Sequence, residues 1–261
     1  MMPGWNANEK PSQQCLERVK RDLADFHADP PPGVFMAPDE KDITTIHAVV
    51  VGAAGTSYEG GFFHLLIKCT KEYPMSPPKV RFMTTDGGRV QFNPHIWPNG
   101  HICLSLLGTM VGQPWTPAHS LSSLAVSIQS MLDDSVGNVD GALDALEHIM
   151  SGFWNPGAAK AMRYETLRVA VCNTIESCLA DNCPFPSSLR DQLLASFTDN
   201  YGKYEEAAKA ELAKNQGGVL SWIGFENKYE TLLARLQNLR KKVEAHSSAD
   251  TTAVPDAREN L

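Results

Sequence analysis

The stretch Ile43–Thr85, ITTIHAVVVGAAGTSYEGGFFHLLIKCTKEYPMSPPKVRFMTT, decides the fold of the first half of the chain. It contains three runs rich in β-branched and aromatic residues, ITTIHAVVVG, GGFFHLLIKCT and KVRFMTT, a composition typical of strands. Between the runs lie AAGTSYEGG and KEYPMSPP, whose Gly, Pro, Ser and Thr residues favour turns. Because both connections are short, we predict consecutive antiparallel strands.

Helices are predicted on both sides of these strands. Before them, apolar residues from Cys15 to Phe26 recur at helical spacing, and Ser12 is a candidate N-cap. After them, apolar residues line one face of SLSSLAVSIQSMLDD, Ser120–Asp134, and we expect only helices from there to about Val243. The last helix carries a narrow apolar seam that lasts fewer than three heptads. A seam of this length favours packing within its own domain over a dimerising coiled coil.

The composition excludes several classes of protein. The 261 residues are 43% hydrophobic, which is ordinary for a folded globular protein. A net charge of −7 argues against a general nucleic-acid binder, and no window approaches the roughly 18 consecutive apolar residues of a membrane span. The first residues lack the apolar core of a secretory signal, and six cysteines in such a chain are typical of reduced thiols. We therefore expect an intracellular protein with no nucleic-acid or membrane partner.

The loop from about Thr85 to Pro117 is the first place to look for chemistry, since a long Pro- and Gly-rich loop in a compact domain is usually functional. It contains FNPHIWPNGHICLSLLGT, Phe92–Thr109, with a single cysteine, Cys103. Cys103 could be a reactive thiol held in a turn or a small apolar residue buried beside Leu104.

No metal or cofactor is expected. His95, His101 and Cys103 could bind zinc, but no paired C-x-x-C or H-x-x-x-H completes a tetrahedral site. The glycines of VGAAGTSYEGG lack the spacing of a phosphate-binding loop. A Cys–His pair of the protease type fits the spacing, but no protease signature surrounds Cys103. Packing roles are favoured for His64 in its strand and for three cysteines on a helical pattern, Cys172, Cys178 and Cys183.

Four motifs in this order resemble the catalytic core of ubiquitin-conjugating enzymes. They are Y-x-G-G-x-F, Y-P-x-x-P-P-K-V-x-F, N-G-x-I-C-L and W-[ST]-P-A, and they begin at Tyr58, Tyr73, Asn99 and Trp115. The resemblance runs from Cys15 to about Asp134. From about Arg163 onward the chain resembles the C-terminal extension of the long Z-type members of the family, whereas DDSVGNVDGALDALEHIMSGFW between them departs from the family pattern.

The resemblance implies an α+β fold in three parts. Residues 12–150 would form the catalytic core, an antiparallel four-stranded sheet with flanking helices. Residues 151–245 would form an all-helical extension packed on the core, and the polar residues 246–261 a disordered tail.

The resemblance also implies an activity, for which Cys103 would be the carrier. A ubiquitin-activating enzyme would pass ubiquitin or another ubiquitin-like modifier to Cys103 as a thioester, and the modifier would then move to a lysine of a protein substrate, usually with a ubiquitin ligase. We expect a monomer of the cytoplasm and nucleus. The alternative is a non-catalytic adaptor of the same fold that binds ubiquitin or a ligase without forming a thioester.

The tripeptide before Cys103 departs from the family. The usual motif is His-Pro-Asn, in which the histidine shapes the loop and the asparagine amide helps to stabilise the oxyanion; here the positions hold Asn93, Pro94 and His95. Three alternatives follow: His95 donates to the oxyanion, His95 is purely structural, or Asn93 takes the donor role. Removing one oxyanion donor typically lowers a rate by about 10²–10³.

Acidic residues and the loop after Cys103 differ in smaller ways. Asp133, Asp134 and Asp140 lie where the family places acids that help to deprotonate the incoming lysine, and of these Asp140 is the candidate, with simple solvation as the alternative. Ser105 replaces an aspartate often found there, and GTMVGQP lengthens the loop before Trp115.

Partner surfaces are predicted on the first helix and on two loops. By position, Arg18 and Arg21 match the basic residues that meet the activating enzyme, the alternative being a solvated helix face. Met75 in YPMSPP, and Pro117 and Ala118 in WTPA, match the loop tips that ligases grip. A role in the core of its loop is the alternative for Met75.

Overall fold

A computed structural model of the chain describes residues 10–134, 156–215 and 225–252. The first helix, α1 (Gln13–Ala28), begins where the sequence predicts, because the Ser12 hydroxyl accepts the Cys15 N–H at 3.1 Å. Its apolar face is buried in the core.

A four-stranded antiparallel sheet follows, with the strands in chain order: β1 (Val34–Pro38), β2 (Thr45–Val51), β3 (Phe62–Lys68) and β4 (Lys79–Phe82). The α+β fold class and the four-stranded sheet are therefore confirmed. The residues of strand β1 do not by themselves predict a strand. Its five residues, VFMAP, show no alternation and end in a proline, which only an edge strand accommodates readily.

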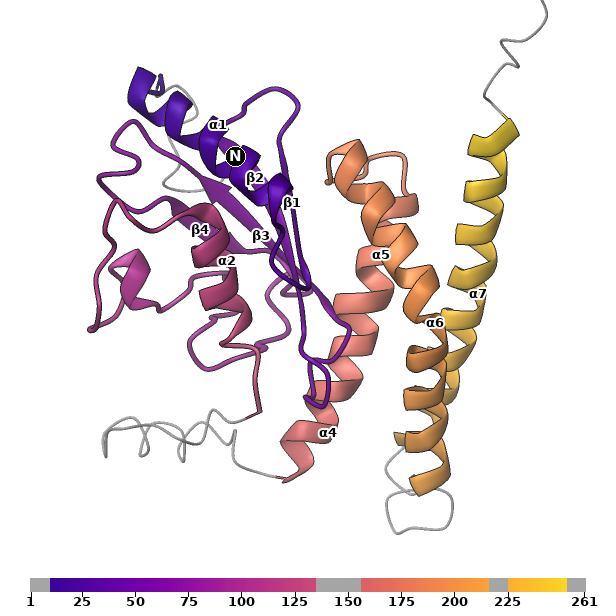
Figure 1. The fold of residues 1–261 in the computed structure, drawn as a ribbon. Coiled ribbons are helices and arrows are strands. Elements are labelled where there is room, and N and C mark those ends of the chain that lie inside the picture. The colour runs from indigo at the N-terminus through magenta and orange to yellow at the C-terminus, as the bar shows by residue number, and fades with distance from the viewer. Residues whose placement is uncertain (1–9, 135–155, 216–224, 253–261) are drawn as a thin grey trace, which may run out of the picture.

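The sheet separates two hydrophobic clusters. Alternate residues of β2 belong to different clusters: Ile46, Ala48 and Val50 pack with α1 and α2 (Leu121–Gln129), whereas Val49 packs with the C-terminal helices. Figure 1 shows the consequence, with α1 and α2 on one side of the sheet and the C-terminal helices on the other. This alternation follows from the two-residue period of a strand.

In the described part of the extension there are five helical segments: α4 (Pro156–Glu165), the π-helical η2 (Thr166–Asn173), α5 (Thr174–Leu179), α6 (Ser187–Asn215) and α7 (Phe225–Thr252). The last two run side by side (Figure 1). The apolar seam of α7 faces the extension's own core, as predicted, with five of its residues buried: Tyr229, Leu232, Leu236, Leu239 and Val243.

Two boundaries differ from prediction. Helix α7 continues past Ala245 to Thr252, into the segment expected to be disordered. The hydroxyl groups of Ser247 and Ser248 donate to the carbonyls of Val243 and Glu244, so the hydrogen bonds of these two side chains are made within the helix. Helix α2 ends at Gln129, before the Asp134 predicted for it. Among the described helices, none is both long and apolar enough to cross a membrane.

Candidate active site

Cys103 lies on a small hairpin. Ile96 pairs with Ile102, and both are 1% exposed, so they anchor the hairpin in the core. The Cys103 N–H donates to the His95 carbonyl at 2.8 Å, which sets these two residues opposite each other. Because side chains alternate along paired strands, Cys103 and His95 share the outer face, and both are partly exposed.

A hydroxyl group fixes the backbone on both sides of Cys103. Thr109 Oγ1 donates to the Ile102 carbonyl at 2.6 Å and accepts the Leu104 N–H at 2.9 Å. The short helix η1 (Ser105–Leu107) lies between Leu104 and Thr109. It ends at Gly108, whose φ of 69° is left-handed. Sequence reasoning missed Thr109; its one signal is its position directly after a glycine at the end of the cysteine-containing stretch.

Asn93 is a loop-shaping residue in this structure. It is 1% exposed, its side-chain amide donates to the Met131 carbonyl at 2.7 Å, and its side-chain oxygen accepts the His95 N–H at 2.8 Å. The side-chain oxygen and one of the two amide N–H groups are thus committed to the loop. All three alternatives for the oxyanion donor stay predictions.

Exposure separates Cys103 from most other thiols of the chain. Burial raises the pKa of the Cys172 thiol to about 12 and raises that of Cys15, Cys69 and Cys178 as well. Cys103 and Cys183 are partly exposed, and the Cys183 thiol lies 3.7 Å from the Phe185 carbonyl. The alternative of a buried apolar role for Cys103 therefore does not hold. Within the described residues, no group of three or more His, Cys, Asp or Glu side chains could hold a metal ion.

Comparison with known proteins completes this description. A sequence model described as ubiquitin-conjugating enzyme matches residues 18–150, which include the whole hairpin that contains Cys103. The chain belongs to the ubiquitin-conjugating enzyme family. It is accordingly a transferase of protein ubiquitination.

Relatives of this conjugating enzyme match the extension as well as the core. It is 38% identical over 250 residues to ubiquitin-conjugating enzyme E2 Z of Xenopus tropicalis, covering 95% of this chain and 77% of the relative. It is 40% identical over 247 residues to the Homo sapiens protein of that name, covering 92% of this chain and 66% of the relative. Ubiquitin-conjugating enzyme E2 2 of Saccharomyces cerevisiae is 36% identical over 141 residues, 52% of this chain and 77% of the relative.

In this conjugating enzyme Arg18 connects α1 to the loop that follows Trp115. Its side chain is 10% exposed and donates to Asp22 at 2.7 Å and to the carbonyls of Pro117 and His119 at 2.6 and 2.5 Å. These bonds hold the guanidinium group in place, and its contact with an activating enzyme stays a prediction. Arg21, one helical turn further on, is exposed, and its contact stays a prediction.

The two loops predicted to meet a ligase lie together. Met75 is 64% exposed, so its alternative role in the loop core is wrong, and Pro117 and Ala118 are exposed as well. The Trp115 indole N–H donates to the Pro74 carbonyl at 2.7 Å and ties the loops to each other. Residues far apart in the chain therefore form one surface.

Of the acidic candidates, the structure describes Asp133 and Asp134 but not Asp140. Asp134 accepts the Ser57 N–H at 2.7 Å and so holds a neighbouring loop. Asp140 lies outside the described residues.

Proposed function

We propose that this conjugating enzyme carries ubiquitin, or a ubiquitin-like modifier, as a thioester on Cys103 and transfers it to a lysine of a protein substrate. The observation that carries the proposal is the fixed, partly exposed position of Cys103, with its own N–H bonded to His95 and its flanking residues bonded to Thr109. A preorganised backbone lets a partner protein deliver its electrophile to one defined position.

The chemistry consists of two acyl transfers. In the first, the Cys103 sulfur forms a bond to the modifier's terminal carbonyl carbon, and the bond to the activating enzyme's sulfur breaks, releasing that thiolate. In the second, the lysine nitrogen bonds to the same carbon, the bond to Cys103 breaks, and the nitrogen gives up a proton to solvent. The thiolate serves as nucleophile and later as leaving group, so no cofactor is needed.

His95 is the donor we propose for the oxyanion of the second step. It lies across the hairpin from Cys103, whereas Asn93 is buried and its amide already donates to the Met131 carbonyl. An imidazole donates one N–H when neutral and two when protonated.

Partners would meet two neighbouring surfaces of the core, because Arg18 of α1 donates to the Pro117 carbonyl. We propose that the exposed Arg21 on α1 contributes to contact with the ubiquitin-activating enzyme, and that the surface of Met75, Pro117 and Ala118 receives ubiquitin ligases. An exposed methionine beside prolines makes an adaptable apolar contact.

A charging assay tests the proposal. Activating enzyme, ATP and ubiquitin are incubated with the parent protein, with Cys103→Ala and with Cys183→Ala, the matched control at the other partly exposed thiol. We expect an adduct that reducing agent removes on the parent and on Cys183→Ala, and none on Cys103→Ala. If no protein charges with any class of activating enzyme, the adaptor alternative takes its place.

A further inference from the structure

Asp86 connects the C-terminal helices to the loop that leads to the active site. It follows β4 and has a φ of 51°, a left-handed conformation that aspartate tolerates better than most residues. Its side chain is 7% exposed, and its carboxylate accepts bonds from Arg89 and Arg168 at 2.8 Å each and from the Asn173 amide at 3.2 Å. Burial alone would raise the pKa of Asp86, but the two guanidinium groups hold it below its usual range.

The contacts continue from η2 into α5 and α7. Arg235 of α7 donates to both oxygens of Glu176, at 2.7 and 2.6 Å, and to the Asn173 side-chain oxygen at 2.7 Å. It also donates to the Arg168 carbonyl at 3.2 Å. A chain of charge-assisted hydrogen bonds therefore runs from α7 through η2 to Asp86.

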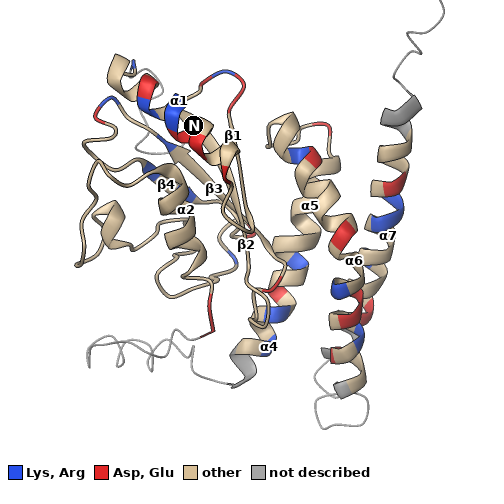
Figure 2. Cartoon of the chain, in the orientation of Figure 1, with Lys and Arg blue, Asp and Glu red and all other residues tan. Residues whose placement is uncertain are grey.

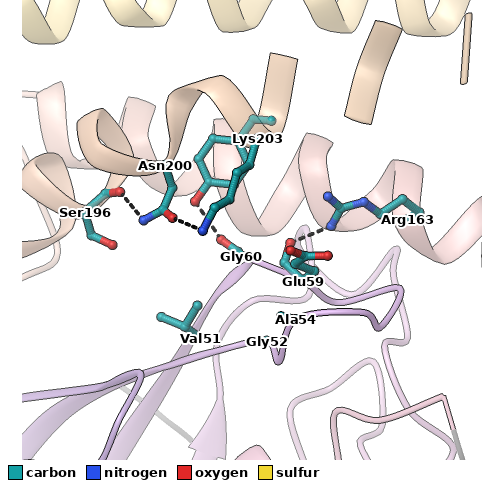
Figure 3. Close-up of a pocket in the computed structure, with 10 residues that line it drawn as sticks. Val51, Gly52, Ala54, Glu59, Gly60, Arg163, Ser196, Asn200 and Lys203 are labelled. Atoms are coloured by element: carbon teal, nitrogen blue, oxygen red, sulfur yellow. Dashed lines mark hydrogen bonds between the residues drawn. The ribbon is translucent and has the colours of Figure 1, made fainter. Parts of the chain in front are cut away.

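The extension also bonds to a second loop of the core, which contains Glu59 and Gly60. Arg163 of α4 donates to the Glu59 carbonyl, and the Tyr204 hydroxyl of α6 donates to the Gly60 carbonyl at 2.9 Å. Figure 3 shows Arg163 reaching Glu59 beside a cavity of about 120 Å³. The adjacent Tyr58 hydroxyl donates to the Phe92 carbonyl at 2.5 Å, so this contact reaches the same segment that Asp86 begins.

We propose that the C-terminal helices position the segment 86–95 for transfer of the modifier, with Asp86 and Arg168 as positioning residues. This inference rests on the proposed thioester function of Cys103. The segment ends at His95, whose carbonyl receives the Cys103 N–H, so a shift of the segment moves the imidazole relative to the thioester. Misplacement of a reacting group by about 1 Å can lower a rate by about 10².

Two arginine variants separate this role from loop stability. Arg168→Ala and Arg89→Ala each remove one guanidinium group from Asp86, but Arg89 belongs to the same loop and is 75% exposed, whereas Arg168 comes from the extension. The charged proteins are discharged with increasing concentrations of free lysine. For Arg168→Ala we expect the maximal rate to fall by about 10-fold with an unchanged half-saturating lysine concentration, partial rescue by Arg168→Lys, and near-parent rates for Arg89→Ala. Equal rates for both alanine variants, whether slow or at the parent level, would overturn the proposal.

Hydrogen exchange gives a readout that does not depend on charging. The N–H groups of Gly88, Arg89 and Val90 all bond to the Thr85 carbonyl, so their exchange reports on the segment. We expect faster exchange across residues 86–95 in Arg168→Ala but not in Arg89→Ala; unchanged exchange in Arg168→Ala overturns the inference. If the parent protein never charges, the thioester proposal fails, and exchange still decides whether the extension holds the segment.

A variant inside the loop covers the case in which Arg168→Ala does not fold. Asp86→Asn keeps a side chain that tolerates the left-handed backbone while removing the charge that both arginines contact. Slower discharge and faster exchange in this variant support the proposal, and parent values for both overturn it.

Discussion

At the scale of single residues, the exchange of residue types within Asn93-Pro94-His95 is the most informative feature. The buried amide of Asn93 shapes the loop, which leaves the imidazole of His95 on the face of Cys103. The order of the two polar residues is reversed relative to the His-Pro-Asn motif, and the side chain in the first position still does the shaping.

This exchange predicts the behaviour of His95 variants. His95→Ala should charge with ubiquitin at the parent rate but discharge to lysine more slowly by about 10², because the oxyanion loses a donor. His95→Asn, which supplies an amide donor, should recover part of the rate. His101→Ala removes an exposed histidine from the other arm of the hairpin and is the control. Parent discharge by His95→Ala would show that His95 is purely structural.

Thr109 leads to a second prediction at this scale. Thr109→Val keeps the shape of the side chain but removes the hydroxyl that bonds to Ile102 and Leu104. We expect the free energy of unfolding to fall by about 1 kcal/mol and the charging of Cys103 to slow, whereas Thr109→Ser should retain both. Urea denaturation and single-turnover charging measure the two effects. A charging rate that is the same in all three proteins would contradict the proposed role.

At the scale of elements, a histidine pair lies between the sheet and the extension. His47 of β2 and His64 of β3 are each 8% exposed, their ring nitrogens lie 3.1 Å apart, and the His64 ring lies 4.7 Å from that of Phe185. Burial lowers the pKa of His64 to about 3, with a smaller contribution from His47. Burial also lowers the pKa of His47, although Asp39 at 3.7 Å acts in the opposite direction. The predicted packing role of His64 is confirmed.

The pair makes stability depend on pH. Because their pKa values are lowered in the folded protein, both histidines take up protons at a lower pH there than in the unfolded chain, where the ordinary pKa is 6.5. The stabilisation is therefore complete above that pH and is lost as pH falls towards 3. The loss should reach about 1.4 kcal/mol per pH unit for each histidine that stays neutral.

Urea denaturation at about pH 7.5 and about pH 5 measures this dependence. His64→Gln keeps a polar partner for His47 without titrating, so it should lose less stability between the two conditions than the parent does. His101→Gln, at an exposed position, should behave like the parent. The explanation fails if the pH dependence of His64→Gln equals that of the parent.

At the scale of the whole molecule, the helical extension packs on one face of the core's sheet. One hydrophobic cluster contains Val49 and Phe62 of the sheet together with Leu236 of α7. Figure 2 shows residues of both charge signs along α6 and α7. The extension thus covers the sheet face opposite α1 and α2, and folding of either part leaves apolar surface for the other to bury.

This shared cluster predicts cooperative unfolding. Leu236→Ala removes a side chain that is 0% exposed, so it should lower the free energy of unfolding by about 2–5 kcal/mol. The melting transition should remain single, because the sheet loses its cover when α7 leaves. Calorimetry tests both points, with the exposed Lys241→Ala as control. Two separate transitions in the parent would show that the extension folds independently.

The sequence by itself determined the local elements and the candidate nucleophile, Cys103. Strand composition, helical spacing and the Ser12 cap act over a few neighbouring residues, so β2, β3, β4, α1 and the seam of α7 could be predicted from them. The motif around Cys103 named the thiol and the family in the same way. Strand β1 could not be predicted from the sequence, because a short edge strand that ends in proline has no local pattern.

Only the tertiary structure decided what each polar side chain binds. Whether Arg18 faces a partner or braces Pro117 depends on a loop about a hundred residues further along the chain, and the fate of the Asn93 amide depends on Met131. The link from Arg168 to Asp86 likewise joins two distant segments. Hydrogen bonds between such segments exist only after packing has brought donors and acceptors within about 3 Å, and a one-dimensional pattern contains no record of that approach.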